Sequence, residues 1–306
     1  MNKTNMGNME KTVRILYKEG QDRLAEAGIH DAVFDARALM SFAVDIPFRD
    51  IPLHYQDAVS DDQALRYDDL IGRRIRKEPL QYITGEQEFM GLSFHVDSRV
   101  LIPRLDTEIL CEEALEYING RIEAESEYVS GRPERHLRVL DLCCGSGALG
   151  LSIAALSDKE TDVVLSDISR DALDVAAENA ERLGVSDKVT FVKSDLFEDI
   201  QGDFDLIVCN PPYIRSDVIL TLDEEVRGHE PVLALDGGSD GLDVYRRIAE
   251  ETPGYLKPQG RLMMETGFDQ GEDLKGLLEA HFKDVRIKKD LAGLDRVISA
   301  VRRTEQ

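Results

Sequence analysis

FDLIVCNPPY, residues 204–213, carries the strongest single indication of the architecture. Its first six residues have the length and the β-branched content of a buried parallel strand. Pro211 and Pro212 end this strand abruptly, because neither can donate a hydrogen bond to a neighbouring strand. The tetrapeptide from Asn210 to Tyr213 is therefore expected to project from the carboxyl edge of a sheet, which is where open α/β sheets bind their ligands.

This tetrapeptide suits the binding of a planar amide or amine. Asn210 offers a side-chain carbonyl oxygen and Pro211 a free backbone carbonyl, so each can accept one hydrogen of an NH2 group. The two prolines restrict the residues before them to extended conformations, and Tyr213 can stack on the planar group. We therefore expect Asn210, Pro211, Pro212 and Tyr213 to orient a nitrogen for attack on an activated carbon. The structural alternative is a proline turn that only closes the strand.

Strands alternate with helices from Leu137 onward. Strands are predicted at residues 137–141, 162–166, 189–192, 204–208, 261–265 and 296–300, and helices at 148–156 and 171–183. Such alternation is typical of a doubly wound, mostly parallel α/β sheet.

Residues 1–80 have a different pattern, which predicts a small helical domain. Apolar residues recur at helical spacing in three stripes between Met9 and Arg76, and Ser60 with Gln63 forms a capping box before the third helix. This helix ends in a basic run within an otherwise acidic chain. The run consists of Arg73, Arg74, Arg76 and Lys77. It is either a solvated face that suits a helix C-terminus or a surface that meets an acidic substrate.

A β-hairpin linker is predicted over residues 81–104. Pro79 and Gly85 break the helical periodicity, and apolar residues between Tyr82 and Val100 flank a turn at Gly91. The elements predicted next are a helix at 107–118 and a loop at 119–136. Residues 105–306 then form the larger domain.

A glycine-rich loop lies between the first predicted strand and the first helix of this larger domain. Gly145, Gly147 and Gly150 satisfy the G-x-G-x-x-G fingerprint of dinucleotide-binding folds. Asp167 follows Gly147 by twenty residues and ends the second strand, where such folds place the acid that holds ribose hydroxyls. The pattern predicts an adenosine-containing ligand without separating NAD from others.

Acids end three successive predicted strands, and this arrangement favours S-adenosyl-L-methionine over NAD. Asp141 ends the first strand, Asp167 the second, and Asp195 the third, where it is expected to meet an adenine amino group. The amide-binding tetrapeptide follows at the fourth strand, and no nearby residue is placed for hydride transfer. With this cofactor, the activated carbon is the sulfonium methyl group. The structural alternative is that the glycines serve packing and the acids cap helices.

The composition argues against several classes of function. The chain has 60 acidic and 37 basic residues, a formal net charge of -23, which disfavours broad DNA binding because such proteins carry a basic face. No apolar run is long enough to span a membrane, and the start MNKTNMGNMEKTVRIL lacks the apolar core of a signal peptide. The four cysteines form no Cys-x-x-Cys motif and the six histidines are scattered, so we expect reduced thiols, no metal site and a cytoplasmic protein.

Further segments along the chain carry a family resemblance. They are EPLQYI at 78–83 with Gly85, LIPRLDTE at 101–108, NPPYI at 210–214, EP at 230–231 with Leu235, GG at 237–238, DGL at 240–242, and KDLAGLDR at 289–296. With the glycine loop, they cover nearly the whole chain, which resembles the bacterial release factor glutamine methyltransferases, a family of protein-(glutamine-N5) methyltransferases. The tetrapeptide alone is shared with amino-methylating DNA enzymes, so the combination is the more specific indication.

The resemblance implies a seven-stranded Rossmann-like methyltransferase sheet that uses S-adenosyl-L-methionine and releases S-adenosyl-L-homocysteine. It assigns the loop from Cys143 to Gly147 and Asp167 to the cofactor, and Leu196 to the adenine pocket. The expected cofactor-binding residues are Asp141, Cys143, Cys144, Gly145, Ser146, Gly147, Asp167, Asp195, Leu196 and Asn210. The tetrapeptide would hold the glutamine of a Gly-Gly-Gln motif in peptide chain release factors. These would be the protein partners of a monomeric enzyme whose N-terminal domain recognises them.

Two places depart from the family pattern. Cys143 and Cys144 stand where the family usually has glycine and threonine, and Leu105 stands where it usually has proline. Cysteine is small enough for the loop, so we expect cofactor binding to be retained. Leu105 should affect only the local shape of the entrance.

Three other functions stay open at this level. A DNA adenine-N6 methyltransferase is disfavoured by the acidic charge and by the lack of a target-recognition region. A catalytically silent adenosine-binding scaffold is disfavoured because Asn210 and the three strand-end acids are all present. The third alternative is an NAD oxidoreductase.

Overall fold

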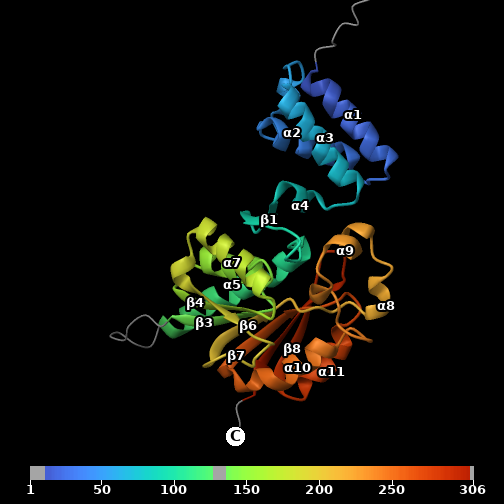
Figure 1. Ribbon diagram of the computed structural model, residues 1–306. Helices are drawn as coiled ribbons and strands as arrows, with labels where there is room; N and C mark the ends of the chain where they lie inside the picture. The colour runs from blue at the N-terminus through green and yellow to red at the C-terminus, as the bar shows by residue number, and fades with distance from the viewer. Residues whose placement is uncertain (1–10, 127–135, 304–306) are drawn as a thin grey trace, which may run out of the picture. The chain divides into compact units, whose positions relative to one another are not determined.

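The computed structural model describes residues 11–126 and 136–303, which form two compact units (Figure 1). The first unit comprises the chain up to Gly85 together with the segment Glu224–His229, and the second comprises the remainder from Glu86 onward. No helix among the described residues is long and apolar enough to cross a membrane.

The first unit is helical, as the apolar stripes predict. Its elements are α1 (Val13–Glu26), α2 (Ala32–Val44), the 3-10 helix η1 (Ile51–His54), α3 (Asp61–Ile75), α4 (Leu80–Thr84) and, from far along the chain, α9 (Glu224–His229). The predicted capping box is present, because the Gln63 backbone N–H donates to Ser60 Oγ and the Ser60 N–H donates to Gln63 Oε1. Tyr82 and Ile83 lie in α4, so the structure is helical where the sequence predicts the beginning of the hairpin.

The basic run at the end of α3 is used inside the first unit. Arg74 is buried, and its guanidinium donates to Asp35 Oδ2 at 2.7 Å and to Glu225 Oε1 at 2.7 Å. Lys77 Nζ donates to two backbone carbonyls at the end of α1. Of the four basic residues only Arg76 is exposed. Arg74 therefore stabilises the first unit and is not available to a partner.

The second unit contains a seven-stranded sheet in the order β5-β4-β3-β6-β7-β9-β8. Its strands are β3 (Leu137–Leu142), β4 (Thr161–Asp167), β5 (Val189–Lys193), β6 (Phe204–Cys209), β7 (Leu256–Glu265), β8 (Phe282–Lys289) and β9 (Asp295–Arg302). All neighbouring pairs from β5 to β7 are parallel, whereas β9 runs antiparallel to both β7 and β8. The predicted seven-stranded, mostly parallel fold is confirmed. The edge strand β8 was missed by the strand pattern because it is half-exposed and rich in charged residues.

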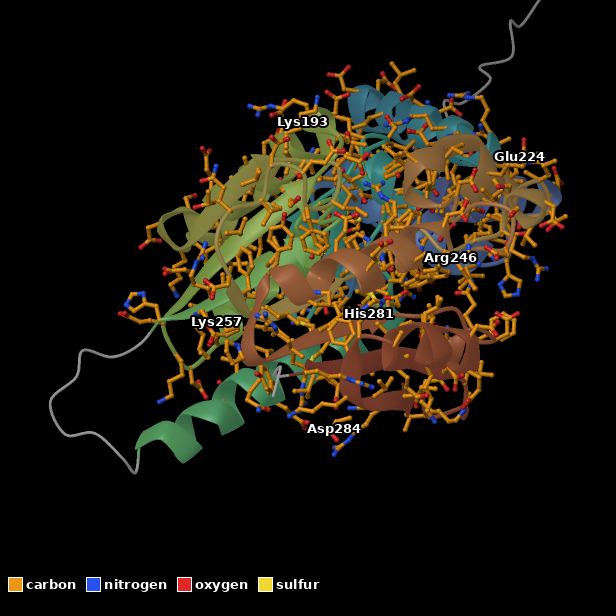
Figure 2. All side chains as sticks on the ribbon, turned by 90° about the horizontal axis from the view of Figure 1, so that it is seen from below. Lys193, Glu224, Arg246, Lys257, His281 and Asp284 are labelled. Carbon is orange, nitrogen blue, oxygen red and sulfur yellow. The ribbon has the colours of Figure 1, made fainter. Side chains whose placement is uncertain are left out.

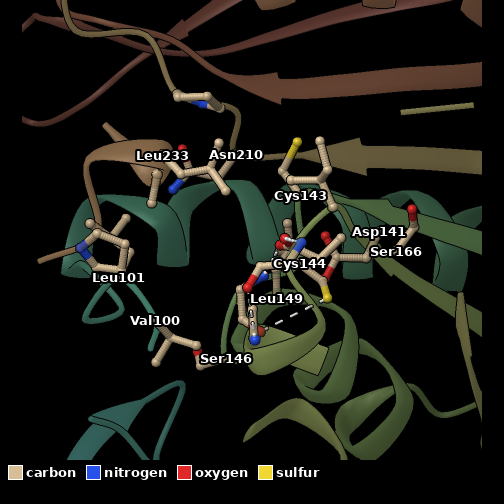
Figure 3. Close-up of a pocket in the computed structure, with 18 of the residues that line it drawn as sticks. Val100, Leu101, Asp141, Cys143, Cys144, Ser146, Leu149, Ser166, Asn210 and Leu233 are labelled. Carbon is tan, nitrogen blue, oxygen red and sulfur yellow. Dashed lines mark hydrogen bonds between the residues drawn. The ribbon is translucent and has the colours of Figure 1, made fainter. Parts of the chain in front are cut away.

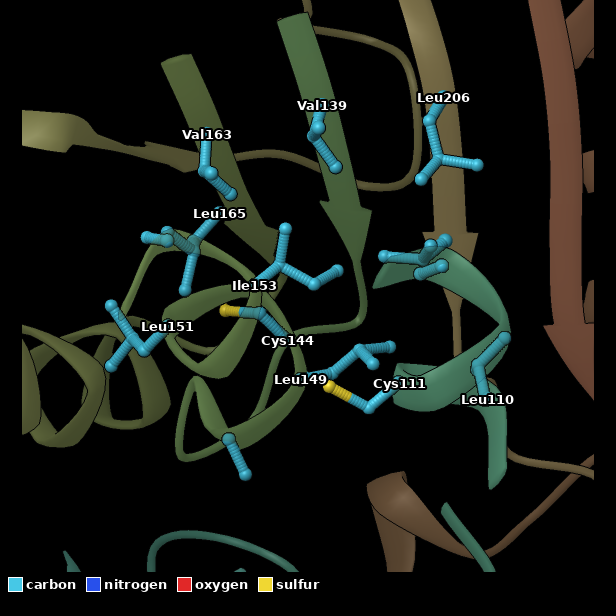
Figure 4. Close-up of a cluster of buried hydrophobic side chains, with 14 of the residues drawn as sticks. Leu110, Cys111, Val139, Cys144, Leu149, Leu151, Ile153, Val163, Leu165 and Leu206 are labelled. Carbon is cyan, nitrogen blue, oxygen red and sulfur yellow. The ribbon is translucent and has the colours of Figure 1, made fainter. Parts of the chain in front are cut away.

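Alternate residues of the strands build two apolar layers. Val139 and Leu206 face a core formed with α5 (Leu105–Ser126), α6 (Ala148–Leu156) and α7 (Arg170–Leu183), as Figure 4 shows. Leu140 and Ile207 face the opposite core, formed with α10 (Asp243–Glu251) and α11 (Gly271–Glu279). Helices therefore cover both faces of the sheet, and polar side chains such as Lys193, Arg246 and His281 lie on the surface (Figure 2). The shorter elements are η2 (Ser186–Lys188), α8 (Ser216–Ile219), η3 (Val232–Ala234) and η4 (Thr252–Gly254).

The hairpin is part of the second unit. It consists of β1 (Glu86–Phe89) and β2 (Leu92–His95), joined by Met90 and Gly91, whose positive φ angles of 53° and 73° suit a tight two-residue turn. Phe89 and Phe94 are fully buried in the core that contains α5, α6 and α7. The second unit thus begins at Glu86, which differs from the boundary at residue 105 expected from the sequence.

Helix α5 is longer than expected. It continues to Ser126, so the predicted loop is wrong for residues 119–126, and residues 127–135 lie outside the described part of the chain. Gly120 lowers helix propensity by only about 1 kcal/mol. Burial of Ile118 and Ala114 against the sheet stabilises the helix more than this local preference disfavours it.

Candidate active site

A cavity of about 290 Å³ lies in the second unit at the carboxyl ends of β3, β4, β5 and β6. The chain runs from β3 to β4 on one side of the sheet, whereas β6 flanks β3 on the other, so the cavity lies at a topological switch point. Figure 3 shows Asn210 and Leu233 on one side of this cavity and Cys143, Cys144 and Ser146 of the glycine-rich loop elsewhere around it. The location agrees with the one predicted from residues 204–213.

Gly147 and Gly150 of the fingerprint are each required for a different structural reason. Gly147 has a φ of 79°, and a Cβ there would lie 2.8 Å from Leu151 Cδ1. A Cβ on Gly150 would lie 2.8 Å from Asp141 Oδ2, the atom to which the Gly150 backbone N–H donates a hydrogen bond of 2.8 Å. Helix α6 can therefore begin directly against the end of β3.

The two cysteines of the loop occupy different environments. Cys143 has a φ of 57°, a conformation that costs a residue with a side chain roughly 1 kcal/mol relative to glycine. This left-handed position gives a physical reason why glycine suits it. Cys144 is buried, and its backbone N–H donates to the Ser166 carbonyl at 3.0 Å. Both thiols are free, and burial raises the pKa of Cys144 well above its ordinary value.

Asp141 is almost completely buried at the end of β3. Burial raises the pKa of its carboxyl to about 8, against the opposing effect of the hydrogen bond from the Gly150 N–H. The side chain therefore holds a proton at neutral pH and anchors the start of α6. Its predicted contact with the cofactor stays a prediction, although Asp141 is among the residues that line the cavity.

Asp167 lines the cavity and organises its surroundings through both carboxyl oxygens. Oδ2 accepts the N–H of Gly145 and Oδ1 accepts the N–H of Ser169, each at 2.9 Å. Burial raises the pKa of Asp167, and the bonds from Ser169 and Gly145 oppose this rise. Each oxygen of an ionised carboxylate keeps a further lone pair, so the side chain can still accept ribose hydroxyls.

Asp195 and Leu196 follow β5 and also line the cavity. Asp195 Oδ1 accepts a hydrogen bond of 2.8 Å from Arg247 Nη1, so the adenine contact expected for this acid competes with an ion pair. Leu196 is buried and has a φ of 49°, an unusual conformation for a bulky residue. Its predicted place beside adenine stays a prediction.

At the other end of the site, Asn210 lines the cavity and donates from Nδ2 to Thr107 Oγ1 at 3.2 Å. No hydrogen bond between described residues uses Asn210 Oδ1 or the Pro211 carbonyl oxygen. Pro212 also lines the cavity, whereas Pro211 and Tyr213 are absent from the described residues that line it. Stacking of Tyr213 on a substrate amide stays a prediction.

Two residues that the sequence did not single out connect to Asn210. Thr107 Oγ1 donates to Glu265 Oε2 at 2.5 Å, and the Tyr213 hydroxyl donates to Glu265 Oε1 at 3.0 Å. Glu265 is 3% exposed, and burial raises its pKa while the two hydroxyl donors oppose this. The sequence did contain a signal for Glu265, because it is a fourth acid at the end of a strand. This strand, β7, lies beside β6, so Glu265 ends near the tetrapeptide.

An ion pair beside the cavity joins two distant segments of the chain. Glu230 is buried and accepts hydrogen bonds from Arg104 Nη2 at 2.5 Å and from the Ile102 N–H at 3.4 Å. Leu105 is exposed at the first position of α5, where proline is also well tolerated, so leucine there leaves the helix start intact. Across residues 11–126 and 136–303, no group of three or more His, Cys, Asp or Glu side chains is arranged to hold a metal ion.

Comparisons with known proteins show the family to which the chain is related. Residues 16–85 match the family model of the PrmC N-terminal domain, and residues 128–224 match that of the methyltransferase small domain. The release factor glutamine methyltransferase of Clostridium acetobutylicum is 40% identical over 88% of this chain and 90% of its own length. Those of Agrobacterium fabrum and Moorella thermoacetica are 38% and 37% identical over 96% of this chain and 98% and 100% of their own.

A solved structure supports the fold alone. The catalytic domain of hMettl16 in complex with MAT2A 3'UTR hairpin 6 superposes with a TM-score of 0.54 and is 15% identical. The superposition covers 80% of this chain and 84% of that chain. The family resemblance and the methyltransferase fold expected from the sequence are confirmed.

Proposed function

The chain belongs to the family of release factor glutamine methyltransferases, and we propose that it transfers a methyl group from S-adenosyl-L-methionine to the side-chain amide nitrogen of a glutamine in peptide chain release factors. The observation that carries this proposal is the Asn210 amide at the cavity, with Oδ1 unpaired among the described residues. An acceptor in this position suits a substrate N–H group.

The residues around the cavity fit S-adenosyl-L-methionine. When bound, this cofactor supplies an electrophilic methyl group on a sulfonium sulfur. The loop from Cys143 to Gly147 would hold it, with Asp167 accepting its hydroxyl groups and Leu196 beside its adenine. The fit rests on the glycine loop, where a Cβ on Gly147 would meet Leu151, and on the remaining lone pairs of the Asp167 carboxylate.

The residues at the substrate end would orient the glutamine amide. Asn210 Oδ1 and the Pro211 carbonyl would each accept one of its two N–H hydrogens, which directs the nitrogen and raises its electron density. The amide nitrogen held in this way would accept the methyl group that S-adenosyl-L-methionine supplies, with S-adenosyl-L-homocysteine as the other product, and one N–H proton would then leave to solvent. No general base is required, because the nitrogen becomes acidic once it is methylated.

The glutamine that we propose as the acceptor lies in a Gly-Gly-Gln motif. Methyl transfer from labelled cofactor to purified release factor, with a DNA duplex measured in parallel, tests the reaction and its alternative. We expect label in the peptide that contains Gly-Gly-Gln and none after the glutamine is replaced by alanine. Label in DNA adenine, with none in release factor, would overturn the proposal.

We propose that the first unit contributes to the choice of substrate, since a site for one planar amide does not distinguish among exposed glutamines. Arg76 is the exposed member of its basic run. Arg76→Glu should therefore raise the KM for release factor, most clearly at low salt, where exposed charges are less screened. An unchanged KM would assign the basic run to the solvated helix end alone.

We infer that the enzyme acts as a monomer in the cytoplasm, where bacterial peptide chains are released.

A further inference from the structure

The side chain of Asn210 has two chemically different ends, and only one of them suits a substrate amide. The carbonyl oxygen Oδ1 can accept a hydrogen bond from the substrate N–H. The amino group Nδ2 is itself a donor, so it cannot bond to the NH2 group of the substrate. The two ends have nearly the same shape, so packing alone does not select between them. Some other group has to set the orientation of this amide.

A chain of three hydrogen-bonding groups reaches Asn210 from β7. Thr107 Oγ1 lies 2.5 Å from Glu265 Oε2 and 3.2 Å from Asn210 Nδ2. A hydroxyl group has a single proton to donate, and an ionised carboxylate can only accept. The Thr107 proton therefore goes to Glu265, and Thr107 can only accept from its other neighbour. That neighbour must be the donor end of the Asn210 amide.

We propose that Glu265, acting through Thr107, is a positioning residue that sets the direction of this hydrogen-bond chain and so presents Asn210 Oδ1 to the substrate amide. The inference rests on the proposed function, because it concerns the acceptor that holds the glutamine. It explains why a buried acid, which is absent from the lining of the cavity, lies behind a buried threonine that belongs to this lining.

The surroundings of Glu265 keep its carboxylate in place. Its other oxygen, Oε1, accepts from the Tyr213 hydroxyl at 3.0 Å, and its backbone carbonyl accepts from the fully buried Tyr245 hydroxyl at 2.7 Å. Both carboxyl oxygens are thus occupied by hydroxyl donors from different segments. Rotation of this buried carboxylate would break two charge-assisted hydrogen bonds.

Adding a proton to Glu265 would reverse the chain. A protonated carboxyl can donate to Thr107, which can then donate to Asn210 Oδ1 and turn Nδ2 toward the cavity. The charged and titratable groups around Glu265 are Asp106 from α5, Arg296 from β9, Tyr213, Tyr245 from α10 and Cys209 on β6. Asp106 and Arg296 form an ion pair of 3.2 Å with each other. Turnover should therefore fall on the acid side as Glu265 becomes protonated.

Two substitutions test the direction of the chain without changing its shape. Glu265→Gln keeps the volume but adds a donor, and Thr107→Val keeps the branching but removes the hydroxyl. Each should lower kcat for methylation of release factor by about 10- to 100-fold. The Kd for S-adenosyl-L-methionine, measured by calorimetry, and the melting temperature should change little. Thr107→Ser should restore most of the activity that Thr107→Val loses.

Thr252→Val is the matched control. Thr252 is also fully buried, but its hydroxyl has no partner among the described residues and it lies outside the lining of the cavity. Its kcat should equal that of the unaltered enzyme. The pH profile adds a readout that a merely structural role would not move, because Glu265→Gln should lose the acid limb of the unaltered enzyme.

The outcomes separate this inference from the proposed function. An unaltered enzyme that does not methylate release factor would overturn the proposed function. An active enzyme whose Glu265→Gln variant turns over at the same rate would overturn only the positioning role. Equal kcat values for Thr107→Val and Thr107→Ser would overturn it too, and this pair decides the question if Glu265→Gln fails to fold. If Glu265→Gln lost only cofactor affinity or melting temperature, Glu265 would have a structural role and no role in positioning Asn210.

Discussion

The proposed cofactor end and the proposed substrate end of the cavity are constructed in different ways. At the proposed cofactor end, one loop of the chain from Cys143 to Gly147 follows β3, and Asp167 holds it by accepting the backbone N–H of Gly145. At the substrate end, side chains make the connections, and Thr107 and Glu265 are 158 positions apart in the sequence. The first end depends on backbone conformation, and the second depends on a few side-chain atoms.

This difference predicts unequal tolerance to substitution. Cys143 and Cys144 stand in the loop with side chains of their own, and backbone N–H groups still hold the loop: that of Gly145 donates to Asp167 and that of Cys144 to the Ser166 carbonyl. A chain of buried hydrogen bonds is less tolerant, because each group depends on the donor or acceptor state of its neighbour. Changes at the cofactor end should therefore affect binding and stability gradually, whereas changes at the substrate end should affect turnover sharply.

The largest effect is expected for Asn210→Ala. Removal of the acceptor that orients the substrate amide should lower kcat by about 100-fold. The Kd for S-adenosyl-L-methionine should stay close to its original value, since the interaction matters mainly in the transition state. Steady-state kinetics on release factor and calorimetry measure the two quantities. A variant with normal turnover would contradict the role of Asn210 and remove the contrast between the two ends.

Asp167→Ala tests the cofactor end. Loss of a charged acceptor for ribose hydroxyls should weaken S-adenosyl-L-methionine binding by about 2 kcal/mol, or roughly 30-fold. The control is Asp174→Ala, which removes a surface carboxylate paired with Arg170 on the same helix that follows Asp167. Calorimetry should detect no change for this control. Tight binding of NAD, without binding of the sulfonium cofactor, would contradict the cofactor assignment.

The buried acid Asp141 should make the stability of the protein depend on pH. Its folded pKa of about 8 lies above the ordinary value of 3.8, so the folded state binds the proton more tightly than the unfolded state does. Its contribution is therefore least unfavourable below about pH 4 and becomes steadily more unfavourable as the pH rises to about 8. Relative to Asp141→Asn, the unaltered protein should lose on the order of 2 kcal/mol of unfolding free energy between pH 6 and pH 8.

Denaturant unfolding of both proteins at the two pH values measures this difference. Parallel curves for the unaltered protein and Asp141→Asn would mean that Asp141 is ionised throughout and would contradict the pKa argument.

The smallest effect is expected for Cys143→Gly. Glycine adopts the positive φ of this position without steric cost, so the substitution should raise the unfolding free energy by about 1 kcal/mol or slightly less. Cofactor affinity should be unchanged, because the backbone of the loop stays the same. A loss of stability would mean that contacts of the cysteine side chain outweigh the backbone strain.

Much of the second unit was predictable from residues that lie close together in sequence. The strand that ends at Cys209, the glycine fingerprint and the strand-end acids could be located because periodicity, glycine spacing and proline breaks are local signals. The length of α5 and the edge strand β8 were less predictable. Packing against the sheet extends α5 beyond its predicted end. Strand β8 forms from a charged segment because it is hydrogen-bonded to β9.

The position of the tetrapeptide at the carboxyl edge of the sheet followed from sequence, because a parallel strand that ends in two prolines has few possible conformations. The prediction of the cofactor rested instead on the glycine fingerprint and on the acids at the strand ends. Tertiary structure alone decided that Thr107 and Glu265 lie behind Asn210, that Arg74 is buried with Asp35, and that the segment Glu224–His229 joins the first unit. Each of these contacts joins distant parts of the chain. Their partners are selected by burial, because a buried polar group must find a donor or acceptor wherever the fold brings one close.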